Sequence, residues 1–203
     1  GTGNKDMTVG NSGGDGTLNL NDGVMELGGN NDGAGLELRR TLQIGQNGGT
    51  QGEFNLGDGL GAAGTASFET WSTVAIGGNS GDGVLNIKSD GLLRINYADA
   101  LALSSQLNIA PGGGAVGVIN QQGGTIDMDG LLQMGTNTAQ AQYNLTGSTG
   151  TVNVRAISAS STSTFTFNLD AGGATKITVE GNVNTAGDVT AGSVSSTVNS
   201  RSD

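Results

Sequence analysis

The sequence predicts an all-β fold, a β-solenoid (β-helix) of about six to seven rungs with three strands per rung. Three observations predict it: a unit that recurs along the chain, an apolar period of two residues within each unit, and a composition rich in turn-forming glycine. Six rungs at a strand spacing of about 4.8 Å would form a rod on the order of 30 Å long.

The recurring unit is clearest at residues 9–20, which read VGNSGGDGTLNL. A Gly or Ala at a turn is followed nine or ten residues later by an Asn with apolar neighbours. The steps between successive markers shorten together, from 31–36 residues to 24–25, so coincidence is a poor explanation. The turn markers are Gly10, Gly45, Gly77, Ala110, Gly135 and Ala159, and the Asn markers are Asn19, Asn55, Asn86, Asn120, Asn144 and Asn168.

Within each unit, apolar residues alternate with polar ones, which is the period of a β-strand and not of a helix. Gly, Asn and Asp clusters between the strands supply sharp turns. A hairpin sandwich is the alternative, but it would not need equivalent residues to recur at a fixed interval. First strands are predicted at 42–44, 74–76, 107–109 and 132–134, second strands around the Asn markers, and third strands at 25–27, 93–95, 126–128, 152–154 and 177–179.

The first three units are longer than the last three. We predict a fourth strand or a short turn in the extra length, at 36–38, 68–71 and 101–103, and therefore a wider N-terminal half. Both markers are lost after Val179. The chain therefore divides into a solenoid at 1–179 and a segment at 180–203, which we expect to form a last rung, a cap or a subunit contact.

The composition excludes several classes of protein. Gly accounts for 39 of 203 residues, but its irregular spacing excludes collagen, and the recurring apolar positions exclude a disordered chain. A net charge of -10 has the wrong sign for binding nucleic acid, and no apolar run approaches the roughly 20 residues of a membrane helix. The chain has no Cys, which argues against a disulfide-stapled domain, and no His, the usual general base and metal ligand.

The Asn column is the first candidate site. Alternation places the six Asn markers on the outer face, one above another. The simpler interpretation is an amide ladder that reinforces strand stacking, and the functional one is a flat polar face for sugar or surface binding. Ice binding would require a regular array of outward Thr residues, whereas the residues two positions before each Asn are of several types. They are Thr17, Glu53, Val84, Val118, Gln142 and Thr166.

Asp22, Asp58 and Asp90 are the second candidate site, because each follows a second strand and precedes a Gly. Stacked carboxylates about 5 Å apart repel one another unless they are solvated or bridged. Calcium, a hard cation that takes oxygen ligands, is the natural bridge. The simpler interpretation is that Asp-Gly makes good turns. The sequence therefore gives calcium as the one cofactor to test, at these three carboxylates.

A third candidate site consists of Arg94, Asp127 and Asp129. The β-helix polysaccharide lyases and hydrolases work with carboxylates and a basic residue clustered on one face. Charges on an exposed strand face are more often simply solvated. We therefore expect a protein that is not an enzyme, and we assign no catalytic residue.

The strings VGNSGGDGTLNL and VAIGGNSGDGVLNI resemble the Gly-Asn-Ser-Gly-x-Gly-x-Leu repeats of bacterial secreted β-helix proteins, including autotransporter passenger domains and large surface adhesins. The resemblance covers about residues 7–179. It implies secretion, a right-handed solenoid and a role in adhesion or extracellular matrix. The chain departs from the pattern at the sixth unit, where Ile157 occupies an expected outward polar position.

We therefore expect a non-enzymatic structural protein of a bacterial surface, either a self-assembling filament or matrix subunit or an adhesin segment. The alternative is a carbohydrate-active β-helix, as a polysaccharide-binding module, lyase or hydrolase, including the phage-fibre type. Open sheet edges at the ends of a solenoid recruit further strands unless they are capped. We expect a homo-oligomer or polymer formed end to end or by strand addition, with polysaccharide as a further partner and neither nucleic acid nor membrane insertion.

Overall fold

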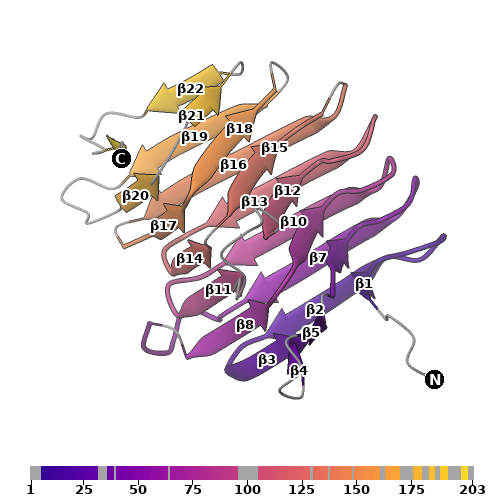
Figure 1. The fold of residues 1–203 in the computed structure, drawn as a ribbon, viewed down its shortest axis with the longest axis horizontal. Helices are drawn as coiled ribbons and strands as arrows, with labels where there is room; N and C mark the ends of the chain where they lie inside the picture. Colours follow the sequence, from indigo (N-terminus) through magenta and orange to yellow (C-terminus); the bar gives the residue numbers. More distant parts are fainter. Residues whose placement is uncertain are drawn as a thin grey trace.

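The computed structural model describes most of the chain between residues 6 and 200, and its strands stack as successive rungs from the N-terminal to the C-terminal end (Figure 1). The described residues form 23 β-strands. They are 6–31, 36–38, 40–63, 65–95, 105–128, 130–136, 138–147, 149–160, 163–169, 176–179, 183–185, 188–191 and 198–200.

Three parallel sheets of seven strands each make up the molecule. Every rung contributes one strand to each sheet, and each strand pairs with the equivalent strand of the rung before and the rung after. This is a right-handed parallel β-helix with three strands per rung, as the sequence predicted. The rungs are β1–β3, β6–β8, β9–β11, β12–β14, β15–β17, β18–β20 and β21–β23, and we number them 1 to 7.

The three sheets are named by the order in which a rung enters them. Sheet 1 holds β1 (Met7–Val9), β6 (Leu42–Ile44), β9 (Thr73–Ile76), β12 (Gln106–Ile109), β15 (Leu131–Met134), β18 (Ala156–Ala159) and β21 (Val183–Thr185). Sheet 2 holds β2 (Gly16–Leu20), β7 (Gln51–Leu56), β10 (Asp82–Ile87), β13 (Val116–Gln121), β16 (Gln140–Gly147), β19 (Thr164–Leu169) and β22 (Asp188–Ala191). Sheet 3 holds β3 (Gly23–Leu27), β8 (Ala66–Thr70), β11 (Gly91–Ile95), β14 (Thr125–Met128), β17 (Thr151–Val154), β20 (Lys176–Val179) and β23 (Val198–Ser200).

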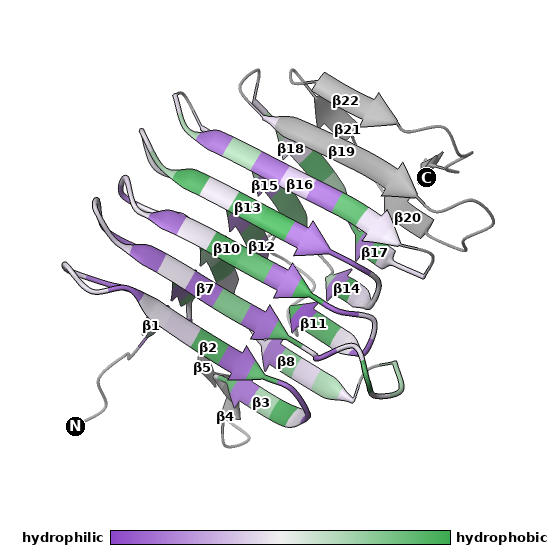
Figure 2. Cartoon of the chain, turned by 180° about the vertical axis from the view of Figure 1, so that it is seen from behind, coloured by the Kyte–Doolittle hydropathy of each residue, from purple (hydrophilic) through white to green (hydrophobic). Residues whose placement is uncertain are grey.

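The core is a stack of apolar side chains enclosed by the three sheets. Alternate residues of each strand point inward, which gives the banding of hydrophobic and hydrophilic residues along β7 and β10 (Figure 2). Phe54 and Phe68 of rung 2 are fully buried and meet edge to face, with ring centroids 5.3 Å apart. The alternation is strict in β7, β10 and β11, so equivalent positions are buried in successive rungs, whereas β8 buries Ser67 as well.

Each rung turns sharply after its sheet 1 strand, at the position of the Gly marker. Gly10, Gly45 and Gly77 have φ of 74°, 67° and 70°, a left-handed conformation that costs a residue with a Cβ about 1–2 kcal/mol. Ala110 takes the same position in rung 4 with φ of 52°. A methyl group on Gly45 would also collide with the backbone carbonyl oxygen of Asp82 in the next rung. Both the backbone conformation and the stacked rung therefore favour Gly here.

The structure corrects the sixth turn marker by one residue. Ala159 ends β18 and pairs with Met134, so Ser160 takes the corner position that follows the strand. Ile157, which the marker spacing placed on the outer face, pairs with Leu132 and is buried, with 7% of its surface exposed. The first strand of rung 6 is therefore regular, and the expected degradation at Ile157 was wrong.

The sixth Asn marker is also displaced. Met134 and Asn144 are ten residues apart, whereas their partners Ala159 and Thr166 are seven apart, so rung 6 reaches the Asn column three residues earlier. Asn168 pairs instead with Thr146, two residues farther along. The prediction that Asn168 continues the Asn column was therefore wrong, and the column ends at Asn144.

The extra residues of the longer units do not build a fourth sheet. The segment predicted at 68–71 belongs to β8, which is the third strand of rung 2. The segment at 36–38 is β5 (Leu36–Leu38), which pairs antiparallel with β4 (Gly29–Asn31) in a small hairpin between rungs 1 and 2. The segment at 101–103 lies outside the described residues. In rungs 1 and 2 the extra residues therefore lie in the connections that follow β3 and β7, and each rung keeps three strands.

The C-terminal segment continues the solenoid in its described strands. β21, β22 and β23 pair with β18, β19 and β20 and add a seventh strand to each sheet. The strands at 183–185, 188–191 and 198–200 therefore supply a further rung, the first of the three roles that the sequence allowed for this segment.

The corner geometry predicts a large difference between two Gly→Ala substitutions. Gly45 and Gly49 both have positive φ, but a methyl group on Gly49 meets nothing within 4 Å. We expect Gly49→Ala to lower the free energy of unfolding by about 1 kcal/mol, and Gly45→Ala to lower it by about 3 kcal/mol or more, because it adds a collision to the backbone strain. Urea denaturation of the two variants measures this. Equal losses would contradict the close stacking at the corner.

Candidate functional site

Sheet 2 presents the most regular outer face of the described structure. Successive residues of each strand alternate between the core and this face, and the parallel register aligns equivalent residues into columns that run along the solenoid. The Asn column holds Asn19, Asn55, Asn86, Asn120 and Asn144; the middle column holds Thr17, Glu53, Val84, Val118 and Gln142; the outer column holds Gln51, Asp82, Val116 and Gln140.

The Asn column is a continuous amide ladder. Each side-chain Nδ2 donates to the Oδ1 of the Asn in the preceding rung. The four N···O distances are 2.8 Å from Asn55 to Asn19, 2.7 Å from Asn86 to Asn55, 2.9 Å from Asn120 to Asn86, and 2.9 Å from Asn144 to Asn120. The predicted register is confirmed for these five residues. Each inner amide uses a donor and an acceptor along the axis, so the ladder reinforces the backbone pairing.

Glu53 joins the ladder from the middle column. Its Oε1 accepts a second hydrogen bond from the Nδ2 of Asn86, at 2.9 Å. Asn86 therefore makes two donor contacts to rung 2 and one acceptor contact to rung 4. This cross-link holds the Glu53 carboxylate in place on the sheet.

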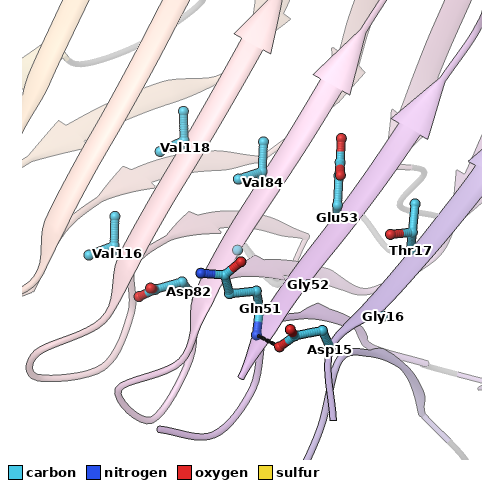
Figure 3. A pocket seen from close by; sticks show the side chains of 11 residues that line it. Asp15, Gly16, Thr17, Gln51, Gly52, Glu53, Asp82, Val84, Val116 and Val118 are labelled. Carbon is cyan, nitrogen blue, oxygen red and sulfur yellow. Dashed lines mark hydrogen bonds between the residues drawn. The ribbon is translucent and has the colours of Figure 1, made fainter. Parts of the chain in front are cut away.

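A groove of about 330 Å³ lies in this face across rungs 1 to 4 (Figure 3). Acidic and amide side chains line it in rungs 1 to 3, and no Lys or Arg is among its lining residues. Val84, Val116 and Val118 line it in rungs 3 and 4. Hydrophobic colour accordingly covers more of β13 than of β7 (Figure 2). The groove thus combines carboxylates and amides with an outward apolar patch.

Val84 and Val118 stood out in the sequence only because they interrupt the Thr pattern that ice binding would need. The stronger signal was that the VxV of residues 116–118 puts apolar side chains where the alternation calls for polar ones. Val116 was missed for that reason. Recognising the patch required the register that sets Val84 beside Val118.

The structure does not stack Asp22, Asp58 and Asp90. Asp22 and Asp58 are exposed, whereas Asp90 is buried with 1% of its surface exposed. Asp58 opens the long connection at 57–65, while Asp90 closes the short connection of the next rung. Among the described residues, no group of three or more His, Cys, Asp or Glu side chains is placed to hold a metal ion. The expected bridge of three carboxylates is therefore not formed.

Asp90 instead holds a loop. Its Oδ2 and Oδ1 accept hydrogen bonds from the consecutive backbone N–H groups of Asp58 and Gly59, at 3.2 and 2.8 Å. Asp58 in turn accepts from the N–H of Leu60, at 2.8 Å. Burial acts to raise the pKa of Asp90 and is the largest single influence, but the hydrogen bonds from Gly59 and Asp58 outweigh it together and lower the pKa.

The outward charged residues of sheet 3 form a column in which Glu26, Glu69, Arg94 and Asp127 follow one another in register. Arg94 lies between Glu69 and Asp127 on the neighbouring strands. Its guanidinium is 3.2 Å from Oε1 of Glu69 and 3.7 Å from Oδ2 of Asp127. The structure thus brings Arg94 and Asp127 together as predicted, whereas Asp129 lies outside the described residues. Glu69 was missed because its segment was taken for a fourth strand. Two carboxylates share one cation here, which is a common way to stabilise an exposed strand face.

Sheet 1 has an incomplete amide column on its outer face. Gln43, Ala75 and Asn108 follow one another in register, and a hollow of about 160 Å³ lies beside Gln43 and Ala75. Oε1 of Gln43 and Oδ1 of Asn108 are buried and make no hydrogen bond in the described part of the chain. Ala75 is too short to supply one. In sheet 2, by contrast, the Asn ladder gives each of four side-chain oxygens a hydrogen-bond donor. These oxygens belong to Asn19, Asn55, Asn86 and Asn120.

Comparison of the chain with protein-family models, with curated proteins and with solved structures gives no match. In the described residues, no helix is long and apolar enough to span a membrane. The function of the chain is therefore inferred from its own geometry.

The ladder predicts a position-dependent effect of Asn→Ala. Asn86 sits inside the ladder with three contacts, whereas Asn19 is exposed at its first rung with one. We expect Asn86→Ala to lower the free energy of unfolding by about 1–2 kcal/mol and Asn19→Ala by about 0.5 kcal/mol or less. Chemical denaturation of both variants tests this. Equal effects would show that the ladder does not act as a connected unit.

The Asp90 contacts predict a pH-dependent stability difference. The pKa of Asp90 is lower in the folded than in the unfolded chain, so its contribution is present above the unfolded pKa and is lost as the pH falls through the folded pKa. We expect Asp90→Asn to lower the free energy of unfolding by about 1–3 kcal/mol at pH 7. Below about pH 4 the free energies of unfolding of the variant and the unmodified protein should converge. Urea unfolding between pH 2.5 and 7 measures it.

Asp22→Asn is the matched control for this measurement. Asp22 also precedes the Gly that opens a sheet 3 strand, but it is exposed and accepts from the adjacent N–H of Gly23. We expect it to change the free energy of unfolding by less than about 0.5 kcal/mol. A gap for Asp90→Asn that does not change with pH would contradict the role assigned to its carboxylate.

Proposed function

We propose that this chain is a rigid, non-enzymatic structural segment of a bacterial surface protein, a filament or matrix subunit or the stalk of an adhesin. The observation that carries the proposal is the unbroken pairing of all three sheets through seven rungs. A structure made of equivalent rungs devotes most of its residues to a regular shape. This favours a structural role, in which the protein acts as a rigid spacer or scaffold.

The geometry supports stiffness. Adjacent rungs are joined along all three sheets, and the Asn ladder adds side-chain hydrogen bonds along the same axis. Bending such a rod would have to shear three hydrogen-bonded sheets at once. Seven rungs at about 4.8 Å span roughly 30 Å from the first strand to the last.

The repeat strings support a place on the bacterial exterior. The Gly-Asn-Ser-Gly strings fall at the corners between sheet 1 and sheet 2, at 10–15 and 77–81, where the positive φ of Gly is needed. The same kind of corner would serve the secreted adhesins and autotransporter passenger domains that these strings resemble. A chain without Cys also keeps its fold independent of redox conditions.

The ends of the described stack support assembly. β1, β2 and β3 at one end, and β21, β22 and β23 at the other, each pair with one neighbouring strand in the described structure. Such edges accept a further strand. The next rung would come from the same, longer protein in an adhesin stalk, or from a second copy in a filament.

A carbohydrate-active β-helix is the second candidate function, and the groove on sheet 2 favours its binding form. Carboxylates, amides and an apolar patch share that groove. The charged column of sheet 3 gives less support to a lyase or hydrolase, because Arg94 is already paired with Glu69 and Asp127.

Self-assembly is tested by sedimentation velocity over a range of micromolar concentrations, with electron microscopy of the same samples. We expect rods with the width of one solenoid and lengths in multiples of about 34 Å, because each subunit adds seven rung spacings. In β1, Met7 and Val9 make the hydrogen bonds to rung 2, so the backbone of Thr8 faces the open edge. Thr8→Pro should therefore shorten the rods without unfolding the chain.

Leu60→Ser is the control for lateral association. Leu60 is 89% exposed at the tip of the 57–65 connection, so it could join rods side by side. We expect this variant to leave rod length unchanged. A monomer at every concentration, or rods lost only with Leu60→Ser, would contradict end-to-end assembly.

A further inference from the structure

Three outward valines form a compact apolar patch on sheet 2. Val84 and Val118 pair across β10 and β13, and Val116 lies two residues before Val118 on the same face. All three are half-buried and line the groove (Figure 3). By strand geometry the patch measures about 5 by 7 Å. Val is a favoured strand residue, but three of them in register on an outward face also give the groove a continuous apolar floor.

Polar groups border the patch on three sides. Asp82 pairs with Val116, and Glu53 pairs with Val84, so carboxylates border it toward rung 2. The Asn ladder borders it along the strands, and rung 5 borders it with two amides. These amides and the neighbouring ladder residues are Gln140, Gln142, Asn86 and Asn120.

We propose that this groove binds a pyranose ring of an uncharged glycan. A pyranose has an apolar face of C–H groups and a rim of hydroxyls, which is the complement of an apolar patch with a polar border. Burying the C–H face against the valines removes apolar surface from water. The hydroxyls donate to the carboxylates of Asp82 and Glu53, and they exchange hydrogen bonds with the amides. A volume of about 330 Å³ accommodates such a ring.

The negative charge of the groove and of the whole chain limits which glycans can bind. No basic residue lines the groove and the chain carries a net charge of -10, so a uronate polymer would be repelled. A cation would be attracted to the carboxylates. However, the three valines, which make up the other half of the groove, would have no part in holding a cation. An uncharged sugar uses both halves of the groove.

The inference does not depend on self-assembly, because all of its residues lie within rungs 2 to 5 of one chain. A soluble form of the protein can therefore be used whether or not rods form. Cellohexaose, maltohexaose and mannohexaose serve as uncharged probes. A chitosan hexamer and a hexagalacturonate serve as cationic and anionic probes of similar length.

Two matched variants separate the groove from the rest of the surface. Val118→Glu and Ser158→Glu each add one carboxylate at an outward strand position, but Ser158 is on sheet 1. Melting curves establish that both fold. Val118→Thr keeps the β-branched shape of the side chain while making it polar, and the half-exposed position leaves the added hydroxyl in reach of water, so the variant tests the apolar contact with little risk to the fold.

Calorimetric titration with each probe, followed by amide chemical-shift mapping, tests whether an uncharged glycan binds in the groove. We expect at least one uncharged probe to bind, with shifts centred on β10 and β13. Its affinity should fall about tenfold or more with Val118→Glu, less with Val118→Thr, and within twofold with Ser158→Glu.

Three results would overturn the proposal. One is the absence of binding by every uncharged probe up to about 10 mM, a concentration at which even weak sites fill. Another is binding of the chitosan hexamer alone, abolished by salt and unaffected by Val118→Thr, which would make the groove a cation site. The third is binding of an uncharged probe that all three variants leave unchanged.

Discussion

The whole molecule depends on stacking each strand directly over its equivalent at about 4.8 Å. Corners have to fit within that spacing, and the corner after sheet 1 is the tightest. Gly45 and Gly52 approach there so closely that a methyl group on either would meet backbone atoms. Short corners in turn keep the strands in register. The recurrence of Gly in the sequence is therefore a consequence of the distance between rungs.

In-register stacking decides which side chains the outer face can hold. An amide is both donor and acceptor, so identical Asn residues stabilise one another, whereas identical carboxylates repel. Sheet 2 repeats Asn over five rungs. Sheet 3 places Arg94 between Glu69 and Asp127. Its one stacked pair of carboxylates in the described strands, Glu26 and Glu69, lies at the first rung, where Glu26 is exposed to solvent. Asp90 avoids the problem because its carboxylate turns to the backbone N–H groups of Asp58 and Gly59.

The sequence predicted the architecture because its two strongest signals are consequences of that stacking. Period two follows from the strand, and the Gly and Asn markers follow from the corner and the ladder. Prediction failed where a connection changed length. The shortened turn before β19 moved Asn168 by two positions, and the long connection at 57–65 made β8 look like an additional strand. Spacing counts residues along the chain, but register is set by pairing in space.

The candidate site was harder to predict for a related reason. The valine patch exists only because Val84 and Val118 are paired, and they are 34 residues apart. Likewise, nothing local distinguishes Asp90 from Asp22, since both stand before a Gly. Their different roles come from the neighbouring rung, where a connection with free N–H groups lies beside Asp90. Alternation identifies the face a residue occupies, and the next rung determines what it contacts there.

A chain of equivalent rungs has to prevent one rung from pairing in the place of another, because the ladder contacts alone are similar at every step. Buried exceptions to the repeat supply that information. Gln121 occupies a core position that Ile87 and Leu145 fill in the adjacent rungs. Its Oε1 accepts from the hydroxyl of Tyr143, and its Nε2 donates to the carbonyls of Gly124 and Thr151.

Any slip by one rung would separate this buried pair and break the hydrogen bond between the hydroxyl of Tyr143 and Oε1 of Gln121 inside an apolar core. Leaving a buried polar group unsatisfied costs about 1–3 kcal/mol. Burial also raises the pKa of Tyr143, so its hydroxyl stays protonated and remains a donor. The pair joins rungs 4 and 5, and rung 4 carries two of the three groove valines. The residues that fix the register therefore also fix the position of the proposed binding surface.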